Sequence, residues 1–582
     1  MNATDELEMI HLRPEASRLE RFNSFIRAEK LLIWTVILLV IVLVFLPMVF
    51  LVLSALNVGD TSSTRVTQFG LDNFARVFRN LDWWYNTFVV AILGTALAIV
   101  IGVTLSWIIN RTTVPWQGFL EQSVLIPFYM TPLLGAIAWS ILGSERSGLI
   151  NRLFMSVFHT QTPLINTHSL LGIVFVVAIY ESCVAFMMIS AAMKSMDPSL
   201  EESSLMLGAG KFATARRITI PLTLPAVGGA ALFIFAGTMG TFAVPAVLGV
   251  NAGVFVITTK IYTVVNRFPP DYALAAALGL ALAAITGVAV AMYGKQMAAN
   301  SYTTITGKSF RPRRMNMGSW TPVLFGICLL YVLVAMVIPL GVLVYTSFLV
   351  TPTTDPQQIH WTLDNYEHAF VKLPIARIAL QTSFVLGILT ATIGVVFMGL
   401  ISWIMYRSKM RGTKLLEYVA MFPQAVPGVV FSLGLLWAWL VIPVGMYGTI
   451  WILLLCYLTV FLPLGVRTMT GVIMQLEPSL EECSRMCGAS WLRTLWSVTV
   501  PLLKPGVLAT WMLLFIVSLR EVSASVLLVS AENKVIGPTL LNFYETALPP
   551  VTAVAVVMAG VIFVGMLAAA MVSRWVGASC RD

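Results

Sequence analysis

Long apolar runs recur along this chain and restrict it to the folds that a lipid bilayer permits. Hydrophobic residues make up 58% of the sequence and charged residues only 11%, whereas ordinary soluble domains are about 25% charged. A run of about 20 apolar residues can cross the hydrocarbon core as an α-helix, which satisfies its own backbone hydrogen bonds. The sequence therefore predicts an all-α, polytopic membrane protein with the lipid bilayer as a partner.

Twelve apolar runs divide evenly between the two halves of the chain. Six crossings return a chain to the side on which it began, so the halves should run parallel. The predicted parts are an N-terminal segment at 1–30, a first half at 31–293, a basic linker at 294–318, a second half at 319–574 and a tail at 575–582. The predicted spans lie at about 31–55, 86–109, 120–143, 170–193, 224–250, 270–293, 319–349, 380–405, 415–440, 448–474, 506–530 and 552–574.

A polar segment in the first half returns in the second. Residues 197–225 read DPSLEESSLMLGAGKFATARRITIPLTLP, and residues 477–505 read EPSLEECSRMCGASWLRTLWSVTVPLLKP. LDNFARVF at 71–78 likewise returns as LDNYEHAF at 363–370. Further matches pair Glu201 with Glu481, Glu202 with Glu482, Gly208 with Gly488, and Ser106–Trp107 with Ser402–Trp403. Repetition over such distances indicates an internal duplication.

Each copy of the polar segment has the features of a short exposed helix. In the first copy, Asp197 can cap the first amides, and Pro198 suits the first helical position. Glu201 and Glu202 lie in the first turn, where carboxylates favour the helix dipole. Gly208 can end the helix or allow another backbone to approach closely. A solvated loop is the simpler alternative for a single copy, but two matching copies favour a shared function.

Both copies resemble the EAA loop of permease subunits in binding-protein-dependent ABC importers. That pattern is EAA, a glycine a few residues later, and then I-x-L-P. The copies read EESSLMLG followed by ITIPLTLP, and EECSRMCG followed by VTVPLLKP. The departures are Ser203, Ser204, Cys483 and Ser484 in place of alanines, and Lys504 in the final L-P.

This resemblance implies a permease that works with other subunits. Loops 194–223 and 475–505 would carry coupling helices that dock into two copies of a cytosolic ABC ATPase. The chain itself would be no enzyme and bind no cofactor, since ATP and Mg would be used by the ATPase. A periplasmic solute-binding protein would deliver the solute. The implied coupling residues are Glu201, Glu202, Gly208, Glu481, Glu482 and Gly488.

The distribution of basic residues predicts the orientation in the membrane. With a cytoplasmic N-terminus, most of the 36 Lys and Arg residues fall on the cytoplasmic side, as the positive-inside rule requires. Both polar segments and the C-terminus are then cytoplasmic. The segment 1–30 is too long and too acidic for a secretory signal. We expect a bacterial inner-membrane protein whose net charge of +9 orients the helices, without a nucleic-acid partner.

Ionisable residues inside predicted spans suggest a translocation path or its outer gate. Arg520 and Glu521 fall near the middle of the run 506–530, and Glu181 falls near the middle of the run 170–193. Buried structural pairing between helices explains each of them equally well. Phe242 and Pro245, in GTFAVPAVLG, occupy the corresponding region of the first half.

The segments GTFAVPAVLG and SLREVSASVLL resemble the fifth-span motifs of fused permeases from ferric-iron-type importers. SGLINR at 147–152 is similar to that branch as well. Related branches are associated with 2-aminoethylphosphonate, other small anions and polyamines, so these solutes stay open. A ferric ion favours oxygen ligands such as Glu181, Glu521 or Tyr180, whereas Arg520 suits an anion or a ferric complex that carries one. The metal ligands are left undetermined.

Two other classes of protein are alternatives to the importer. An ion-coupled secondary transporter also has repeats and about twelve spans, but it has no use for the paired polar segments. A membrane-embedded enzyme would need a catalytic motif such as H-E-x-x-H, which the sequence lacks. No disulfide framework is implied by the six cysteines, and we interpret Cys483 and Cys487 as packing residues rather than a metal site.

Overall fold

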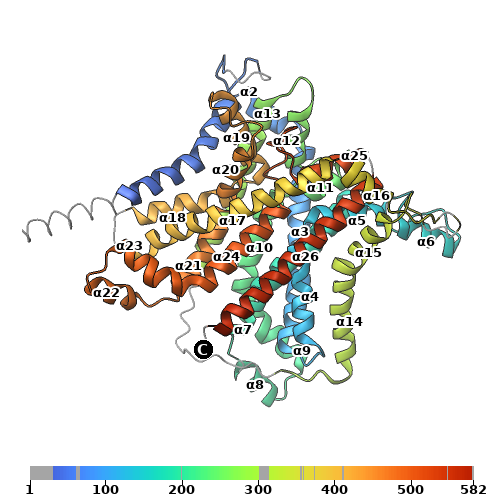
Figure 1. Ribbon diagram of the computed structural model, residues 1–582. Helices are drawn as coiled ribbons and strands as arrows, with labels where there is room; N and C mark the ends of the chain where they lie inside the picture. Colours follow the sequence, from blue (N-terminus) through green and yellow to red (C-terminus); the bar gives the residue numbers. More distant parts are fainter. Residues whose placement is uncertain are drawn as a thin grey trace, which may run out of the picture.

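Apolar helices account for most of the computed structural model in Figure 1. The structure describes residues 31–60, 66–197, 199–299, 314–353, 357, 359–372, 374–408, 412–546 and 548–579. The predicted segment 1–30, most of the linker and the last residues of the tail lie outside these ranges. Within them, nine helices can cross a membrane by length and composition, or twelve if each of three bent pairs is one span. The predicted fold class is therefore confirmed.

The first half contains six spans and several short helices. They are helix Leu31–Ala55, α2 (Asp72–Arg79), α3 (Leu81–Arg111), α4 (Gln117–Tyr129), α5 (Pro132–Gly143), α6 (Leu149–Phe158), α7 (Leu170–Ser195), α8 (Ser199–Met206), α9 (Lys211–Thr214), η1 (Ala215–Thr219), α10 (Ile220–Met239), α11 (Ala243–Leu248), α12 (Ile257–Asn266) and α13 (Tyr272–Ala299).

The second half repeats this order. Its elements are α14 (Thr321–Val332), η4 (Leu333–Val337), α15 (Ile338–Ser347), α16 (Asp364–Glu367), η6 (His368–Lys372), α17 (Ile375–Arg407), α18 (Thr413–Met421), η7 (Phe422–Ala425), α19 (Gly428–Val441), α20 (Ile450–Val460), α21 (Leu462–Ile473), α22 (Pro478–Met486), α23 (Trp491–Thr494), η8 (Leu495–Thr499), α24 (Val500–Arg520), α25 (Ile536–Thr546) and α26 (Leu548–Ser579).

Equivalent hydrogen bonds in the two halves agree with the internal duplication. Asn73 and Asn365, from the repeated LDN segments, are both buried and both donate to two backbone carbonyls at the end of the preceding span. Ser106 Oγ donates to a carbonyl of α7 over 3.3 Å, and Ser402 Oγ donates to a carbonyl of α21 over 3.0 Å. The repeated residues thus hold the same helix pairs together in each half.

Three spans predicted as continuous are bent. The break between α4 and α5 turns the chain by 93°, that between η7 and α19 by 106°, and that between α20 and α21 by 54°. Proline explains the first two, because the residue before a proline avoids helical dihedral angles. Thr131 precedes Pro132 and is extended, as is Val426 before Pro427.

The predicted runs 224–250 and 506–530 are wrong in their bounds. The fifth-span helices begin earlier, because π-helical turns η1 and η8 lead without a break into α10 and α24. They also end earlier, at Met239 and at Arg520. Arg520 and Glu521 therefore lie at the end of a helix rather than near the middle of a span. Glu521 is extended and its carboxylate accepts a hydrogen bond from the amide of Ala524 over 2.9 Å, which favours a separate turn there.

The first span of each half packs against the other half. On helix Leu31–Ala55, the ring of Phe45 lies 5.4 Å from that of Phe422, and the Pro47 carbonyl approaches Gly434 of α19. On α14, the hydroxyl of Tyr331 donates to the carbonyl of Ile179 in α7 over 3.1 Å. The two sequence halves are thus interlocked, and movement of either involves a span of the other.

The contact between Pro47 and Gly434 provides a test of whether the first span of each half packs against the other half. A Cβ on Gly434 would lie 2.5 Å from the Pro47 carbonyl oxygen, so Gly434→Ala should lower the free energy of unfolding by about 1–3 kcal/mol. Gly237→Ala is the matched control, since a Cβ on that helical glycine meets nothing within 4 Å. Thermal unfolding of the purified proteins measures both changes. Equal thermal midpoints for the two variants would contradict the packing of the first span against α19.

Candidate functional site

The two polar segments form short helices that project from the helical body. Figure 1 shows α8 and α22 at its edge. Asp197 caps α8 as predicted, because its Oδ1 accepts a hydrogen bond from the amide of Ser199 over 2.9 Å. Pro198 lies outside the described residues. In the second copy Glu477 is the N-cap residue of α22, and its side chain makes no capping bond.

Gly208 and Gly488 end these helices in the left-handed conformation, with φ of +85° and +82°. The amide of Gly208 donates to Leu205 O over 3.0 Å, and the amide of Ala209 donates to Ser204 O over 3.1 Å. This is a Schellman motif, which favours glycine at the left-handed position. The second copy has equivalent bonds. Among the described residues of this chain, no other backbone approaches either glycine closely, since a Cβ there would meet nothing within 4 Å.

Each short helix is fixed to the protein by a buried ion pair. Arg111 Nε lies 3.4 Å from Glu201 Oε1, and Arg407 Nε lies 3.8 Å from Glu481 Oε1. Threonine hydroxyls donate to the same carboxylate oxygens, over 2.5 Å from Thr219 and 3.0 Å in the second copy. A buried carboxylate is stable only where such partners replace water. Glu201 and Glu481 are therefore anchors, and their side chains are not part of the exposed helix face.

The two arginines connect the anchors to the membrane spans. Arg111 is the last residue of α3 and donates to Met193 O in α7 over 2.7 Å. Arg407 is the last residue of α17 and donates to Leu476 O over 2.6 Å. Sequence reasoning missed both. The signal was present, because SWIINR ending at Arg111 matches SWIMYR ending at Arg407.

The outward face of the short helices is apolar at matching positions. Met206 is 89% exposed and Met486 is 88% exposed. Glu202 is partly exposed and Glu482 is exposed, so the second glutamate of each pair faces away from the anchor. Cys483 and Cys487 are exposed too, so their interpretation as packing residues is wrong. The paired exposed methionines give the two helices similar surfaces.

Arg520 lies at a contact between the two halves. Its guanidinium lies 4.8 Å above the ring of Phe128 in α4 and interacts electrostatically with Glu181 in α7 and with Glu521. All three charged residues lie deep in the fold, yet each side chain keeps a partly accessible surface.

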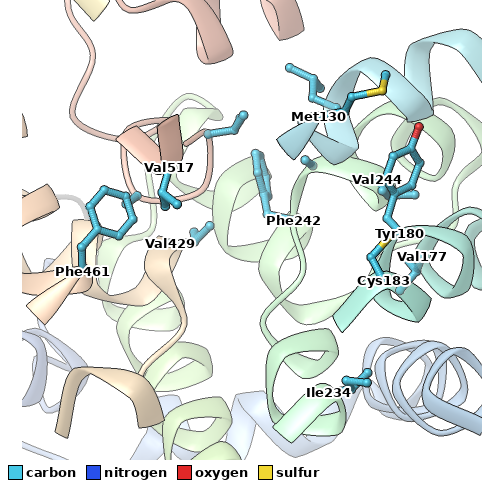
Figure 2. Close-up of a cluster of buried hydrophobic side chains, with 14 of the residues drawn as sticks. Met130, Val177, Tyr180, Cys183, Ile234, Phe242, Val244, Val429, Phe461 and Val517 are labelled. Carbon is cyan, nitrogen blue, oxygen red and sulfur yellow. The ribbon is translucent and has the colours of Figure 1, made fainter. Parts of the chain in front are cut away.

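Phe242 and Pro245 lie on the first-half side of the same region and are buried among apolar groups. Phe242 is 1% exposed and its ring packs on that of Tyr262 at 5.4 Å. Figure 2 shows Phe242 in a buried cluster with Val429 and Val244 from the two halves. Structure thus brings Glu181, Arg520 and Glu521 together and leaves Phe242 and Pro245 in apolar surroundings.

The breaks in the spans of one half meet those of the other half. A Cβ on Gly240, which follows α10, would lie 3.0 Å from Pro427 at the break before α19. Arg520, at the end of α24, lies on Phe128 just before the break between α4 and α5. Non-helical backbone at membrane depth is tolerated only where protein or a water-filled cavity surrounds it. The centre of the molecule meets that condition.

A second polar contact between the halves involves Ser140, His168 and Tyr544. Ser140 Oγ on α5 lies 2.6 Å from the hydroxyl of Tyr544 on α25 and 3.3 Å from Nε2 of His168, which precedes α7. Burial lowers the pKa of His168. The described residues contain no group of three or more His, Cys, Asp or Glu that could hold a metal ion.

Known proteins resemble the chain over most of its length. Residues 395–578 match the family described as the binding-protein-dependent transport system inner membrane component. The ferric transport system permease protein FbpB of Actinobacillus pleuropneumoniae is 28% identical over 552 residues, which are 94% of this chain and 78% of that protein. These similarities support a permease subunit of a binding-protein-dependent ABC importer. Together with the apolar helices, they also support a multi-pass protein of the inner membrane.

Two further permeases show the extent of the similarity. A putative ferric transport system permease, FbpB 1 of Haemophilus influenzae, is 31% identical over 60% of this chain and 55% of its own length. A probable ABC transporter permease, y4fN of Sinorhizobium fredii, is 24% identical over 84% of this chain and 86% of its own length. The similarity extends through both halves of the permease, which agrees with the internal duplication.

The two glutamates of the first segment should differ in how much their charge contributes to stability. Glu201→Gln leaves Arg111 buried without its countercharge, so we expect a loss of about 3–5 kcal/mol in unfolding free energy. Glu202→Gln should change it by less than about 0.5 kcal/mol, because that side chain is not buried. Thermal unfolding and limited proteolysis of the loop measure the difference. If Glu202→Gln were the more damaging change, the anchor assignment would be wrong.

Acidification should weaken the folded permease through His168. Because its pKa is lowered in the folded state, the unfolded chain binds the proton more tightly. Stability should therefore be complete above the ordinary histidine pKa of about 6.5 and fall as the pH drops from there towards the lowered value. Thermal midpoints measured across this range should depend less on pH in His168→Gln than in the wild type. Identical slopes would rule out this contribution.

Proposed function

We propose that this chain forms the whole transmembrane part of an ABC importer for ferric iron. Two of the relatives above are named as ferric transport permeases, and the first covers 94% of this chain. A spermidine/putrescine transport permease of Salmonella typhimurium is 25% identical over 38% of the chain, so a polyamine is the weaker alternative. 2-Aminoethylphosphonate or another small anion is the other alternative, because Arg520 would suit its charge.

Two copies of a cytosolic ABC ATPase dock on α8 and α22 in this proposal. The observation that carries it is the duplicated anchor, in which an arginine at the end of a span holds the glutamate of a short helix. Met206 and Met486 would enter the ATPase clefts, and Glu202 and Glu482 would contact their rims. Movement of either ATPase would reach α3, α7 and α17 through Arg111 and Arg407, since these arginines bond both the helices and the spans.

The solute would pass between the halves where the broken spans meet. A periplasmic binding protein would present it at the outer face, and closure of the ATPases would rock the halves apart. Arg520 would act in the gate, because its contacts with Phe128 and Glu181 join the two halves and must break when they separate. Glu521 would hold the turn after α24 in place. Phe242 and Pro245 would form the apolar wall on the first-half side.

The predicted topology follows from the same proposal. Both termini would be cytoplasmic, with the permease halves at 31–293 and 319–574 and the coupling loops at 194–223 and 475–505. The basic linker at 294–318 would join the halves on the cytoplasmic side. Its described end lies against the first anchor, because the amide of Met315 donates to Arg111 O over 2.8 Å. This contact supports a linker on the same side as the coupling loops.

Substitution of both glycines tests the coupling role. Gly208→Val with Gly488→Val forces β-branched residues into left-handed backbone, which is strained for any residue with a Cβ. We expect solute-dependent ATP hydrolysis by the reconstituted complex to fall at least tenfold, while membrane insertion is retained. Gly210→Ala is the control in the same loop, because its φ is −66° and its Cβ would meet nothing within 4 Å. Full activity of the double variant would exclude the coupling assignment.

The solute is tested with the same reconstituted complex. Stimulation of ATP hydrolysis by a binding protein loaded with ferric ion, and not by one loaded with 2-aminoethylphosphonate or polyamine, is the expected result. The reverse preference would keep the importer and change the solute. Uptake that follows an ion gradient without any ATPase subunit would instead favour a secondary transporter.

A further inference from the structure

An apolar cavity lies between the two halves at the level of the broken third span. Its volume is about 320 Å³, within the range of about 300–1,000 Å³ found for small-molecule sites. The walls come from α4, from η4 and α15 of the exchanged first span, and from α26. The lining includes Ile126, Tyr129, Met336, Leu340, Phe563 and Met566.

The pseudo-symmetric position in the molecule is closed by protein side chains. There, the rings of Phe45 and Phe422 pack at 5.4 Å, and the hydroxyl of Thr286 donates to the carbonyl of Ala425. The repeat offsets place Val337, Ile126 and Met566 at the positions of Phe45, Phe422 and Thr286. The cavity therefore exists where smaller or unbonded side chains replace the ring pair and the hydrogen bond.

The cavity opens onto the lipid-facing surface. Phe563 and Val344 belong to its lining and are 45% and 42% exposed, and the neighbouring Val337 and Leu567 are 50% and 46% exposed. These residues lie on helices that can cross the membrane, where exposed apolar side chains face lipid tails. The cavity is thus continuous with the surface that already contacts hydrocarbon.

We propose that this cavity binds an acyl chain of a membrane lipid between the two permease halves. A methylene group occupies a volume similar to that of water, about 30 Å³, so the cavity holds roughly ten carbons of one chain. Its lining offers almost only apolar surface, which excludes a headgroup from the interior. The headgroup stays in the leaflet while the chain enters sideways.

The bound chain adjoins the proposed gate. Tyr129 and Met130 line the cavity and are the last residues before the break between α4 and α5. The preceding residue, Phe128, carries the guanidinium of Arg520. An acyl chain in the cavity therefore separates α4 from α26 beside a contact that joins the halves. The site itself depends only on the membrane location, and not on the solute.

Photolabelling of the full permease in nanodiscs tests the site. A phosphatidylethanolamine with a diazirine near the end of one acyl chain is cross-linked, and labelled peptides are mapped by mass spectrometry. Label should concentrate on peptides with Tyr129, Met336 and Met566. In the double variant Ile126→Phe/Val337→Phe, which copies the closed position, label on these peptides should fall about fivefold. Ile92→Phe, on a 54% exposed side chain of α3, is the control and should leave it unchanged.

The reciprocal variant keeps the test independent of how well the filled variant folds. Phe45→Val with Phe422→Ile should open the closed position and create new label on peptides from α13 and η7. Label spread evenly over all lipid-facing helices of the wild type, or no change in either double variant, would overturn the proposal. If solute did not stimulate ATP hydrolysis but the label was still found at the cavity, the proposed importer function would be contradicted and the lipid site would stand.

Discussion

The buried ion pair between a span-ending arginine and the glutamate of a short helix determines much of this structure. Arg111 with Glu201, and Arg407 with Glu481, place charge where water is largely excluded. Removing one partner of such a pair leaves an uncompensated buried charge. Threonine hydroxyls donate to the carboxylates, and carbonyls at the ends of neighbouring spans accept from the guanidinium groups, while Arg111 Nε and Nη1 and Arg407 Nε have no hydrogen-bond partner among the described residues. The short helices are therefore rigidly joined to the spans, which a coupling element must be in order to transmit force.

The spans themselves are broken where the two halves meet. Proline breaks the third span of each half, and the fifth spans end at Met239 and Arg520. These ends and breaks contact one another across the halves, as Gly240 does with Pro427. The end of α24 places Arg520 in this interior, where it interacts electrostatically with Glu181 of the continuous helix α7. The first span of each half packs on the other half around this centre, as shown by the hydroxyl of Tyr331 in the second half, which donates to α7 of the first half.

The two halves have matching residues at the anchors but different residues in the centre of the molecule. In the sequence repeat, Gly240 is equivalent to Arg520, and Phe461 is equivalent to Glu181. Neither of these central charges therefore has a charged counterpart in the other half. The acyl-chain cavity is unmatched as well, because Phe45 and Phe422 close its equivalent. The two halves are thus alike where they would meet identical ATPases, and they differ along the proposed path and at the lipid surface.

The sequence by itself determined the fold class, the duplication and the short helices with their terminal glycines, because each depends on local composition or on repetition. It located Glu201 and Glu481 but not their role, since the arginine partners are far away in the chain and only packing brings them within reach. The ends of the fifth spans at Met239 and Arg520 were missed, because hydropathy continues through GTFAVPAVLG and VSASVLL while the helix does not. Only the tertiary structure decided which charges meet across the halves and where a cavity remains, because both depend on side chains that come together from separate helices.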